Sequence, residues 1–229
     1  MKYKDIYNDI RHKIIRGDYP SYKNIESEEM LCLKYEVSRE TLRKAIGKLK
    51  DDGYLHSRQG SGIFVNPKEF YLNTSLLTLS ERNKDSEVVV ESVIIDFEVI
   101  RADQVLLDIF NIQEKTSFYH YRRLRKVNGE PYTLEETYMP VKLFKKFDRN
   151  ALYGSVLEYI ENNYGVVVSH DIKKIQAIIP SSEVKKLLNI SDNRCLLMQE
   201  HKVYLSKNII AQYTIEIDKN NEITFASVR

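Results

Sequence analysis

The feature that most constrains the fold of this chain is a pair of short predicted helices followed by a glycine-containing hairpin, between residues 27 and 65. In the second predicted helix, apolar residues recur at intervals of three and four, which is the spacing of one helical face. These residues are Leu42, Ala45, Ile46 and Leu49. An apolar face must pack against neighbouring elements, so the stretch predicts a small helical domain.

The opposite face of this helix is charged and mostly basic. It carries Glu40, Arg43, Lys44 and Lys48. Ser38 precedes the helix as the expected N-cap, which leaves free backbone N–H groups and the positive end of the helix dipole beside Arg39. Such a helix end binds phosphates, and a helix that follows a shorter helix and a turn is the arrangement that enters the DNA major groove. The alternative is an ordinary solvated surface helix.

The hairpin that follows indicates the same function. Residues 54–58 and 63–65 have strand composition, and Gln59-Gly60-Ser61-Gly62 between them has turn composition. The two glycines allow positive φ angles and a close approach of the backbone to a ligand. The hairpin is therefore expected to be a wing that lies along the DNA backbone, although glycine-rich hairpins are also common in other proteins.

In this order, the motifs resemble the winged-helix domain of GntR-type bacterial transcription regulators, over about the first third of the chain. The matching segments are Val37-Ser38-Arg39, Thr41-Leu42-Arg43, Gly53-Tyr54-Leu55 and Gly60-Ser61-Gly62-Ile63-Phe64-Val65. The resemblance implies that the second helix contacts bases or phosphates and that the glycine hairpin enters the minor groove. The DNA-binding residues that we expect are Ser27, Ser38, Arg39, Thr41, Arg43, Lys44, Arg58, Gln59, Gly60, Ser61 and Gly62.

One departure from the family pattern is Glu29, which stands where the family usually has arginine. A carboxylate at this position would repel phosphate. Either Glu29 turns away from the DNA, or it accepts a hydrogen bond from a cytosine amino group. We favour the first alternative. Ser27 is still expected to cap the preceding helix, with Glu28 and Glu29 in its first turn.

The charge and composition of the chain agree with a DNA-binding protein of two domains. The net charge is only +2, but residues 1–68 carry 14 Lys and Arg against 10 Asp and Glu, while the remainder is slightly acidic. The chain has no long apolar run, and its first 19 residues are a charged amphipathic segment with a predicted helix at about 3–16, so we expect a cytoplasmic protein without a membrane partner. Cys32 and Cys195 are expected to be reduced core residues, and neither a metal site nor a cofactor is expected.

The remaining sequence predicts a second domain of α+β class. A winged helix-turn-helix domain over residues 1–68 and a linker over 69–75 precede it, and the second domain covers 76–229. We expect strands at 87–100, 117–127, 131–139 and 166–179, and helices at 103–110, 143–147 and 155–162. Residues 181–190 repeat the pattern of residues 103–112 at an offset of about 78, and each stretch is a predicted helix followed by a basic strand and a hairpin. Such a duplication predicts one antiparallel sheet with helices on a face and a pseudo-twofold cleft, although chance repetition is an alternative.

Arg123 and Arg125 are the candidate ligand-binding residues of this domain. They point to the same face of a predicted strand, and a pair of guanidinium groups suits a phosphate or a carboxylate. An edge strand protected by charge is the alternative. Glu135 lies on the partner strand. A two-residue Asn128-Gly129 turn would place Glu135 opposite Arg122, and a three-residue turn would place it opposite Arg123.

Residues 77–225 resemble the UTRA ligand-sensing domain of the HutC-type branch of the same regulators, whose fold is similar to chorismate lyase. The matching segments are Arg123-Leu124-Arg125, Asn128-Gly129-Glu130-Pro131, Glu135, Thr137-Tyr138, Pro140, Ser155-Val156-Leu157-Glu158-Tyr159 and Tyr164-Gly165. By resemblance, the effector pocket would be lined by Thr78, Arg123, Arg125, Glu135, Ser155 and Tyr213. The segment Asp218-Lys219-Asn220 departs from the family pattern at the edge of this pocket.

The resemblance implies a transcription regulator and not an enzyme. It would be a homodimer that binds operator DNA and represses a carbohydrate uptake or catabolic operon, and a small anion in the second domain would change its DNA affinity. The two arginines and Ser155 favour a sugar phosphate. Two other classes stay open: a lyase-like enzyme in the second domain, and a DNA-binding protein without an effector.

Overall fold

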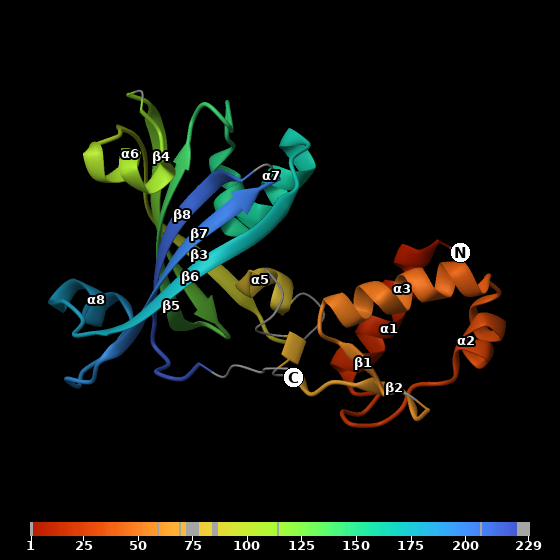
Figure 1. Ribbon diagram of the computed structural model, residues 1–229. Helices are drawn as coiled ribbons and strands as arrows, with labels where there is room; N and C mark the ends of the chain where they lie inside the picture. The colour runs from red at the N-terminus through yellow and green to blue at the C-terminus, as the bar shows by residue number, and fades with distance from the viewer. Residues whose placement is uncertain are drawn as a thin grey trace. The chain divides into compact units, whose positions relative to one another are not determined.

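The computed structural model describes residues 2–58, 60–68, 70–71, 78–83, 87–113, 115–206 and 208–223 (Figure 1). These residues divide into two compact units. The first is built mainly from residues up to 71, and the second from residues 78–83 and 88–222. The predicted linker over 69–75 lies largely outside the described residues, so its bounds stay a prediction. None of the described helices is both long and apolar enough to cross a membrane.

Among the described residues, the main elements of the first unit are helices and a two-stranded hairpin. They are α1 (Tyr3–Arg16), α2 (Glu28–Tyr35), α3 (Arg39–Asp51), β1 (Leu55–Arg58) and β2 (Gly62–Val65). The apolar face of α3 is buried against α1 and α2, and Ile6, Ile10 and Leu31 complete this core. The predicted winged helix-turn-helix is confirmed.

The second unit is a six-stranded antiparallel sheet with helices packed on it. Its elements are α5 (Leu79–Arg82), β3 (Val90–Arg101), α6 (Gln104–Phe110), β4 (Ser117–Val127), β5 (Glu130–Pro140), η1 (Arg149–Tyr153), α7 (Val156–Tyr164), β6 (Val168–Ile178), α8 (Ser182–Leu187), β7 (Leu196–Leu205) and β8 (Ile209–Asp218). The strand order is β3-β4-β5-β8-β7-β6. The predicted α+β class is confirmed, and the helical patch predicted at 143–147 is wrong because this segment forms turns ahead of η1.

The sheet has the pseudo-twofold symmetry that the sequence repeat predicts. The series β3, α6, β4, β5 is followed by the series β6, α8, β7, β8, and the strand order is the same read from either edge. The first three elements of the second series lie 78 residues after their counterparts, within a residue or two at their ends. The central contact between β5 and β8 pairs Glu136 with Ile215. The repeat in the sequence is therefore a structural duplication.

The two faces of the sheet differ in polarity. One face packs on α6 and α8 through apolar side chains, among them Leu124, Leu134 and Phe118. The other face carries polar and charged side chains, including Arg123, Arg125 and Glu135. Since side chains alternate along a strand, each strand contributes to both faces. The predicted effector residues Arg123, Arg125 and Glu135 thus lie on one face.

Of the two cysteines, Cys195 is exposed, so its predicted place in the core is wrong.

Candidate DNA-binding and effector sites

The N-terminus of α3 has the cap that the sequence predicts. Ser38 Oγ accepts a hydrogen bond from the backbone N–H of Thr41 at 3.3 Å and lies 3.0 Å from Thr41 Oγ1. Ser27 caps α2 in the same way, since its Oγ accepts from the N–H of Met30. The caps fix where both helices start, and the first turn of α3 therefore presents free backbone N–H groups next to Arg39.

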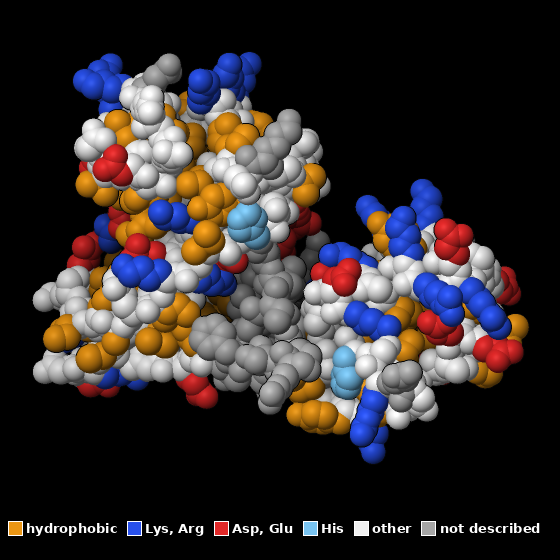
Figure 2. Space-filling model, in the orientation of Figure 1, with side chains coloured by type: hydrophobic (Ala, Val, Ile, Leu, Met, Phe, Trp, Pro, Cys, Tyr) orange, Lys and Arg blue, Asp and Glu red, His pale blue; other side chains and the backbone are white. Residues whose placement is uncertain are grey.

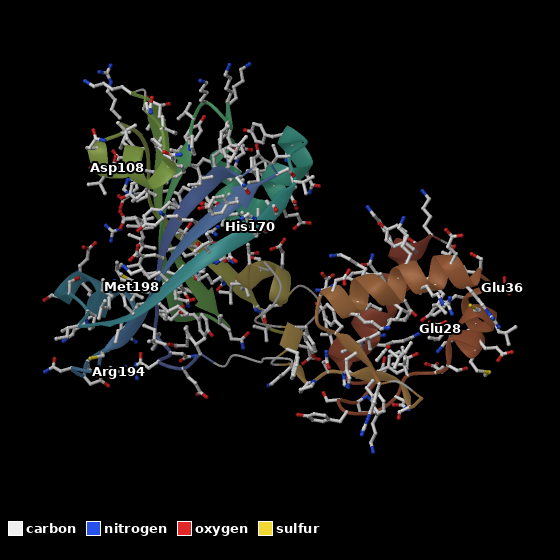
Figure 3. The ribbon with its side chains drawn as sticks, viewed as in Figure 1. Glu28, Glu36, Asp108, His170, Arg194 and Met198 are labelled. Carbon is white, nitrogen blue, oxygen red and sulfur yellow. The ribbon has the colours of Figure 1, made fainter. Side chains whose placement is uncertain are left out.

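The basic side chains of α3 differ in their contacts. Arg39 and Arg43 are exposed, and Arg43 Nε lies 2.9 Å from Glu28 Oε2. Glu28 is labelled on α2 in Figure 3. The ammonium group of Lys44 lies 4.7 Å from the ring centre of Tyr3, which holds it against α1. Lys and Arg side chains are spread over the visible surface of this unit, with acidic side chains among them (Figure 2). Arg39 and Arg43 are the two α3 arginines that solvent reaches.

The wing is held by a residue that the sequence did not single out. Asn24 Nδ2 donates a hydrogen bond to the carbonyl of Ser61 at 2.9 Å, and Gly60 and Gly62 have φ angles of +73° and +107°. A Cβ at position 62 would lie 3.3 Å from Asn24 Nδ2, so a larger residue there is strained by both its φ angle and this contact. Arg58 is exposed at the end of β1. Gln59 lies outside the described residues.

Substitutions of Glu28 and Glu29 would test how acidic side chains near α3 affect operator binding. Glu28→Gln is expected to tighten operator binding roughly two- to thirtyfold, because in each copy of the expected homodimer Arg43 loses an exposed ion pair of about 0.2–1 kcal/mol and one negative charge is removed. Fluorescence anisotropy with operator DNA measures this. Weaker binding would mean that Glu28 holds Arg43 in its binding position.

Glu29 has no ion-pair partner among the described residues, and Glu29→Ala should leave the operator preference unchanged. Relaxed specificity at one C·G pair would instead support a contact between Glu29 and a cytosine amino group.

Arg123 is committed to contacts within the protein. It is buried, its Nε donates to Glu135 Oε2, and its Nη1 donates to the carbonyls of Leu152 at 2.9 Å and Gly154 at 3.1 Å. Burial opposes the charge on Arg123, but the Glu135 carboxylate outweighs this effect and the pKa of Arg123 is raised. The pair therefore fixes β4 and β5 to the segment that precedes α7.

The pairing of Arg123 with Glu135 combines features of both predicted turns. The turn has two residues, Asn128 and Gly129, with φ angles of +50° and +82°, and Val127 pairs with Glu130. Between Arg125 and Lys126 the register then shifts by one residue. This bulge moves Glu135 from Arg122, where a regular two-residue hairpin would place it, to Arg123.

Arg125 has different surroundings, although it lies only two residues further along the same face. Its side chain is 1% exposed, yet no carboxylate among the described residues forms an ion pair with it. Its Nη2 donates to Ser80 Oγ and its Nη1 to the carbonyl of Gly154 at 3.4 Å, whereas its Nε has no hydrogen-bond partner. Burial and the nearby positive charge of Arg123 lower the pKa of Arg125. A buried cation with only neutral hydrogen-bond partners is suited to pair with an anion.

The other predicted effector residues are distributed unevenly around Arg125. Ser155 follows Gly154 and caps α7, where its Oγ accepts from the N–H of Glu158 at 3.1 Å. Thr78 caps the short helix α5, and it is Ser80 in the same helix that contacts Arg125. Ser80 was missed because no periodicity marks its segment. The structure brings Ser155 and the α5 segment to the arginine, with Ser80 as the contact residue.

Tyr213 lies on the opposite face of the sheet from Arg125. Its ring packs with Phe110 and Phe118 near α6, and its hydroxyl donates to Glu200 at 2.9 Å. Tyr213 lies on this face because of the length of the loop in the second hairpin. Three residues separate β7 from β8, against two between β4 and β5, so Thr214 and not Tyr213 occupies the position equivalent to Glu135. The structure therefore does not bring Tyr213 to the arginine site.

A second charged cluster surrounds His201, the counterpart of Arg123 in the duplication. His201 is buried on the polar face, with Nε2 3.1 Å from Glu216 and Nδ1 3.5 Å from Asp171. Burial alone would lower the pKa of His201, but the Glu216 and Asp171 carboxylates outweigh burial and the repulsion of Lys173, and they raise it to about 9. His201 is therefore charged at neutral pH.

The stability of the second unit should depend on pH through His201. Its folded pKa of about 9 lies above the ordinary value of 6.5, so its stabilising contribution is complete below pH 6.5 and is lost as the pH rises through 9. The expected loss is about 3 kcal/mol. Urea unfolding between pH 6 and 10 measures it, and His201→Gln should remove most of this slope. An equal slope in both proteins would show that other groups cause it.

A winged helix-turn-helix unit joined to an α+β unit with a buried arginine that has only neutral hydrogen-bond partners has the architecture of a ligand-responsive transcription regulator. Residues 2–65 match the model of the bacterial regulatory proteins of the gntR family, and residues 85–223 match the UTRA domain. The chain belongs to the GntR family of bacterial transcription regulators, in the branch whose members carry a UTRA domain.

Two curated relatives and one solved structure cover nearly the whole chain. The chain is 30% identical over 229 residues to the mannosyl-D-glycerate transport/metabolism system repressor MngR of Escherichia coli, with 99% of this chain and 95% of the relative covered. It is 28% identical over 233 residues to the transcriptional regulator GmuR of Bacillus subtilis, with 99% and 98% covered. The crystal structure of the possible transcriptional regulator YydK from Bacillus subtilis has the same fold, with a TM-score of 0.84, 21% identity, and 100% and 99% of the chains covered.

Proposed function

We propose that this protein is a repressor of a carbohydrate uptake or catabolic operon, and that a small anionic effector bound at Arg125 changes its operator affinity. The surroundings of Arg125 are the main support for this effector site, because Arg125 is a buried cation without a carboxylate ion-pair partner among the described residues. The likeness to MngR supports the class of effector, since the system that this relative represses handles a sugar derivative that bears a carboxylate. A sugar phosphate is the effector that we propose, with its anionic group on Arg125.

For DNA binding, we propose a homodimer in which the first unit of each copy contacts the operator. Each copy would insert α3 into one half-site of a pseudo-palindromic operator, with half-site centres about 34 Å or a multiple of it apart. Arg39, Thr41 and Arg43 would contact bases or phosphates, and the hairpin at Gly60 and Gly62 would reach the minor groove. Two copies are required because the excess positive charge of each head is small.

A thermal-shift screen with sugar phosphates and small organic acids tests the effector site. A ligand present at about 100 times its dissociation constant stabilises the folded protein by about 2.7 kcal/mol, which corresponds to a rise in Tm of roughly 5–10 °C for a domain of this size. Arg125→Gln is expected to abolish the rise. Arg194→Gln is the matched control, because Arg194 is an exposed arginine of the same unit and its ion pair is with Asp192, two residues away (Figure 3).

Two outcomes would contradict this assignment. A rise of the same size in Arg125→Gln would place the effector elsewhere, and the absence of a rise with every compound would favour a DNA-binding protein without an effector. Turnover of a tested acid would instead favour the lyase-like alternative. Operator binding by the same preparations, measured with and without the compound, shows whether the effector releases or strengthens DNA contact.

A further inference from the structure

A surface groove lies at one end of the UTRA sheet, on the face that packs on α6. It is formed by residues 111–112 and 115–116 after α6, by residues 140, 142 and 143 at and after the end of β5, and by the ends of β7 and β8. Its volume is about 580 Å³, which is within the range of small-molecule sites. Arg125 belongs to the opposite face of the sheet, so the groove is separate from the proposed effector site.

The floor of the groove is apolar and continuous with the core under α6. Phe110 packs on Phe118 with ring centres 4.6 Å apart, and Ile112 and Ile210 pack against the same cluster. Ile209 at the start of β8 is 43% exposed. An apolar surface of this kind, open at the side of a packed core, gains free energy when a hydrophobic group covers it.

Hydrogen bonds hold the walls of the groove in place. The N–H of Ile112 donates to the carbonyl of Leu107 at 2.9 Å, and the N–H of Ala102 donates to the carbonyl of Thr116 at 3.0 Å. On the other side, the N–H of Val141 donates to the carbonyl of Ser117 at 3.0 Å. Both loops are therefore tied to the strands, and the groove is formed before any ligand binds, which lowers the entropic cost of binding.

Two lysines lie at the rim of the groove. Lys115 and Lys142 come from different loops and are both exposed, and no Asp or Glu is among the described residues that line the groove. Lys and Arg side chains gather at the upper end of this unit in Figure 2. An occupant that complements both the floor and the rim carries an apolar body and a single negative group.

We propose that this groove binds an amphipathic organic anion, with its aliphatic or aromatic body on Phe110, Ile112 and Ile210 and its carboxylate between Lys115 and Lys142. The protein then has a second ligand site in addition to the one at Arg125. Phe110 and Phe118 pack in the same cluster as Tyr213 and Tyr138. Phe118 and Tyr138 belong to β4 and β5, and the other face of these two strands carries Arg123 and Glu135. A ligand in the groove would therefore lie against the strands that support the proposed effector site.

Calorimetric titration of the full chain with octanoate tests the proposal. Saturable binding of one octanoate per chain is expected, and octylammonium, which has the same tail and the opposite charge, should bind at least about tenfold more weakly, since each tenfold is about 1.4 kcal/mol. The Lys115→Gln, Lys142→Gln double variant should lose at least about tenfold in octanoate affinity. The Lys185→Gln, Lys186→Gln double variant on α8 is the matched control and should bind as the unaltered protein does.

Methyl NMR spectra of the isoleucines locate the ligand independently of the lysines. Octanoate should shift the methyl signals of Ile112, Ile209 and Ile210 and leave those of the first unit unchanged. Equal binding of octanoate and octylammonium, binding that the lysine double variant retains in full, or no saturable binding would each overturn the proposal. Because these readouts do not involve Arg125, their failure is distinct from failure of the effector proposal.

Discussion

Replacement of Glu135 by alanine is expected to lower the free energy of unfolding of the second unit by about 3–5 kcal/mol. The substitution leaves the buried guanidinium group of Arg123 without its carboxylate, and the two carbonyl oxygens that it also contacts do not neutralise a positive charge. Urea unfolding followed by far-UV circular dichroism measures the change, since the chain has no tryptophan.

Two further variants separate this charge effect from simple loss of a side chain. Glu130→Ala is the matched control, because Glu130 is an exposed carboxylate at the start of the same strand and should change stability by no more than about 0.5 kcal/mol. The double replacement Arg123→Met, Glu135→Leu should recover most of the loss, since apolar residues of similar volume can replace a buried ion pair. A loss below about 1 kcal/mol in Glu135→Ala would show that Arg123 finds another partner.

Arg43→Ala is expected to weaken operator binding by about 30-fold or more. Each arginine contact to a base or phosphate contributes about 1–3 kcal/mol, and a dimer would lose two of them. The thermal shift produced by an effector should stay unchanged, since Arg43 belongs to the first unit. Anisotropy titrations at two salt concentrations measure both the affinity and the number of phosphate contacts.

Arg16→Ala is the matched control for Arg43→Ala. Arg16 is an exposed arginine of the same unit, at the end of α1, and its ion pair is with Asp18 in the adjoining turn. If Arg16→Ala weakened operator binding as strongly as Arg43→Ala does, general charge and not a contact of α3 would explain the loss. If Arg43→Ala removed the effector response together with DNA binding in a folded protein, the two functions would not reside in separate sites.

The sequence allowed the first unit to be predicted nearly to the residue, because its signals are local. Helix α1 has the predicted bounds, Ser27 and Ser38 cap the predicted helices, and the glycines at 60 and 62 have the positive φ angles of the predicted turn. Each of these depends on neighbours within a few residues. Asn24 was missed because its contact to Ser61 spans 37 residues and leaves no periodic pattern.

The second unit shows where such reasoning stops. The strands and the duplication could be predicted, whereas the distinct surroundings of Arg123 and Arg125 could not, since both are arginines on one face of one strand. Which of them has a carboxylate partner depends on the bulge after Arg125, and the position of Tyr213 depends on one residue in a loop. A register shift of one residue moves every side chain of a strand to the other face of the sheet, and the amino-acid composition of the strand gives no sign of such a shift.

The unequal hairpins of the duplicated sheet also determine how far its two halves can act alike. Two copies of one ancestral unit would begin with two equivalent pockets on the polar face, related by the central axis. With three residues between β7 and β8, the second copy presents Thr214 where the first presents Glu135, and Val203 stands in the second copy at the position of Arg125. The pseudo-twofold axis therefore relates the backbone of the two halves and not their chemistry on this face, so we expect one copy of the proposed effector site per polypeptide.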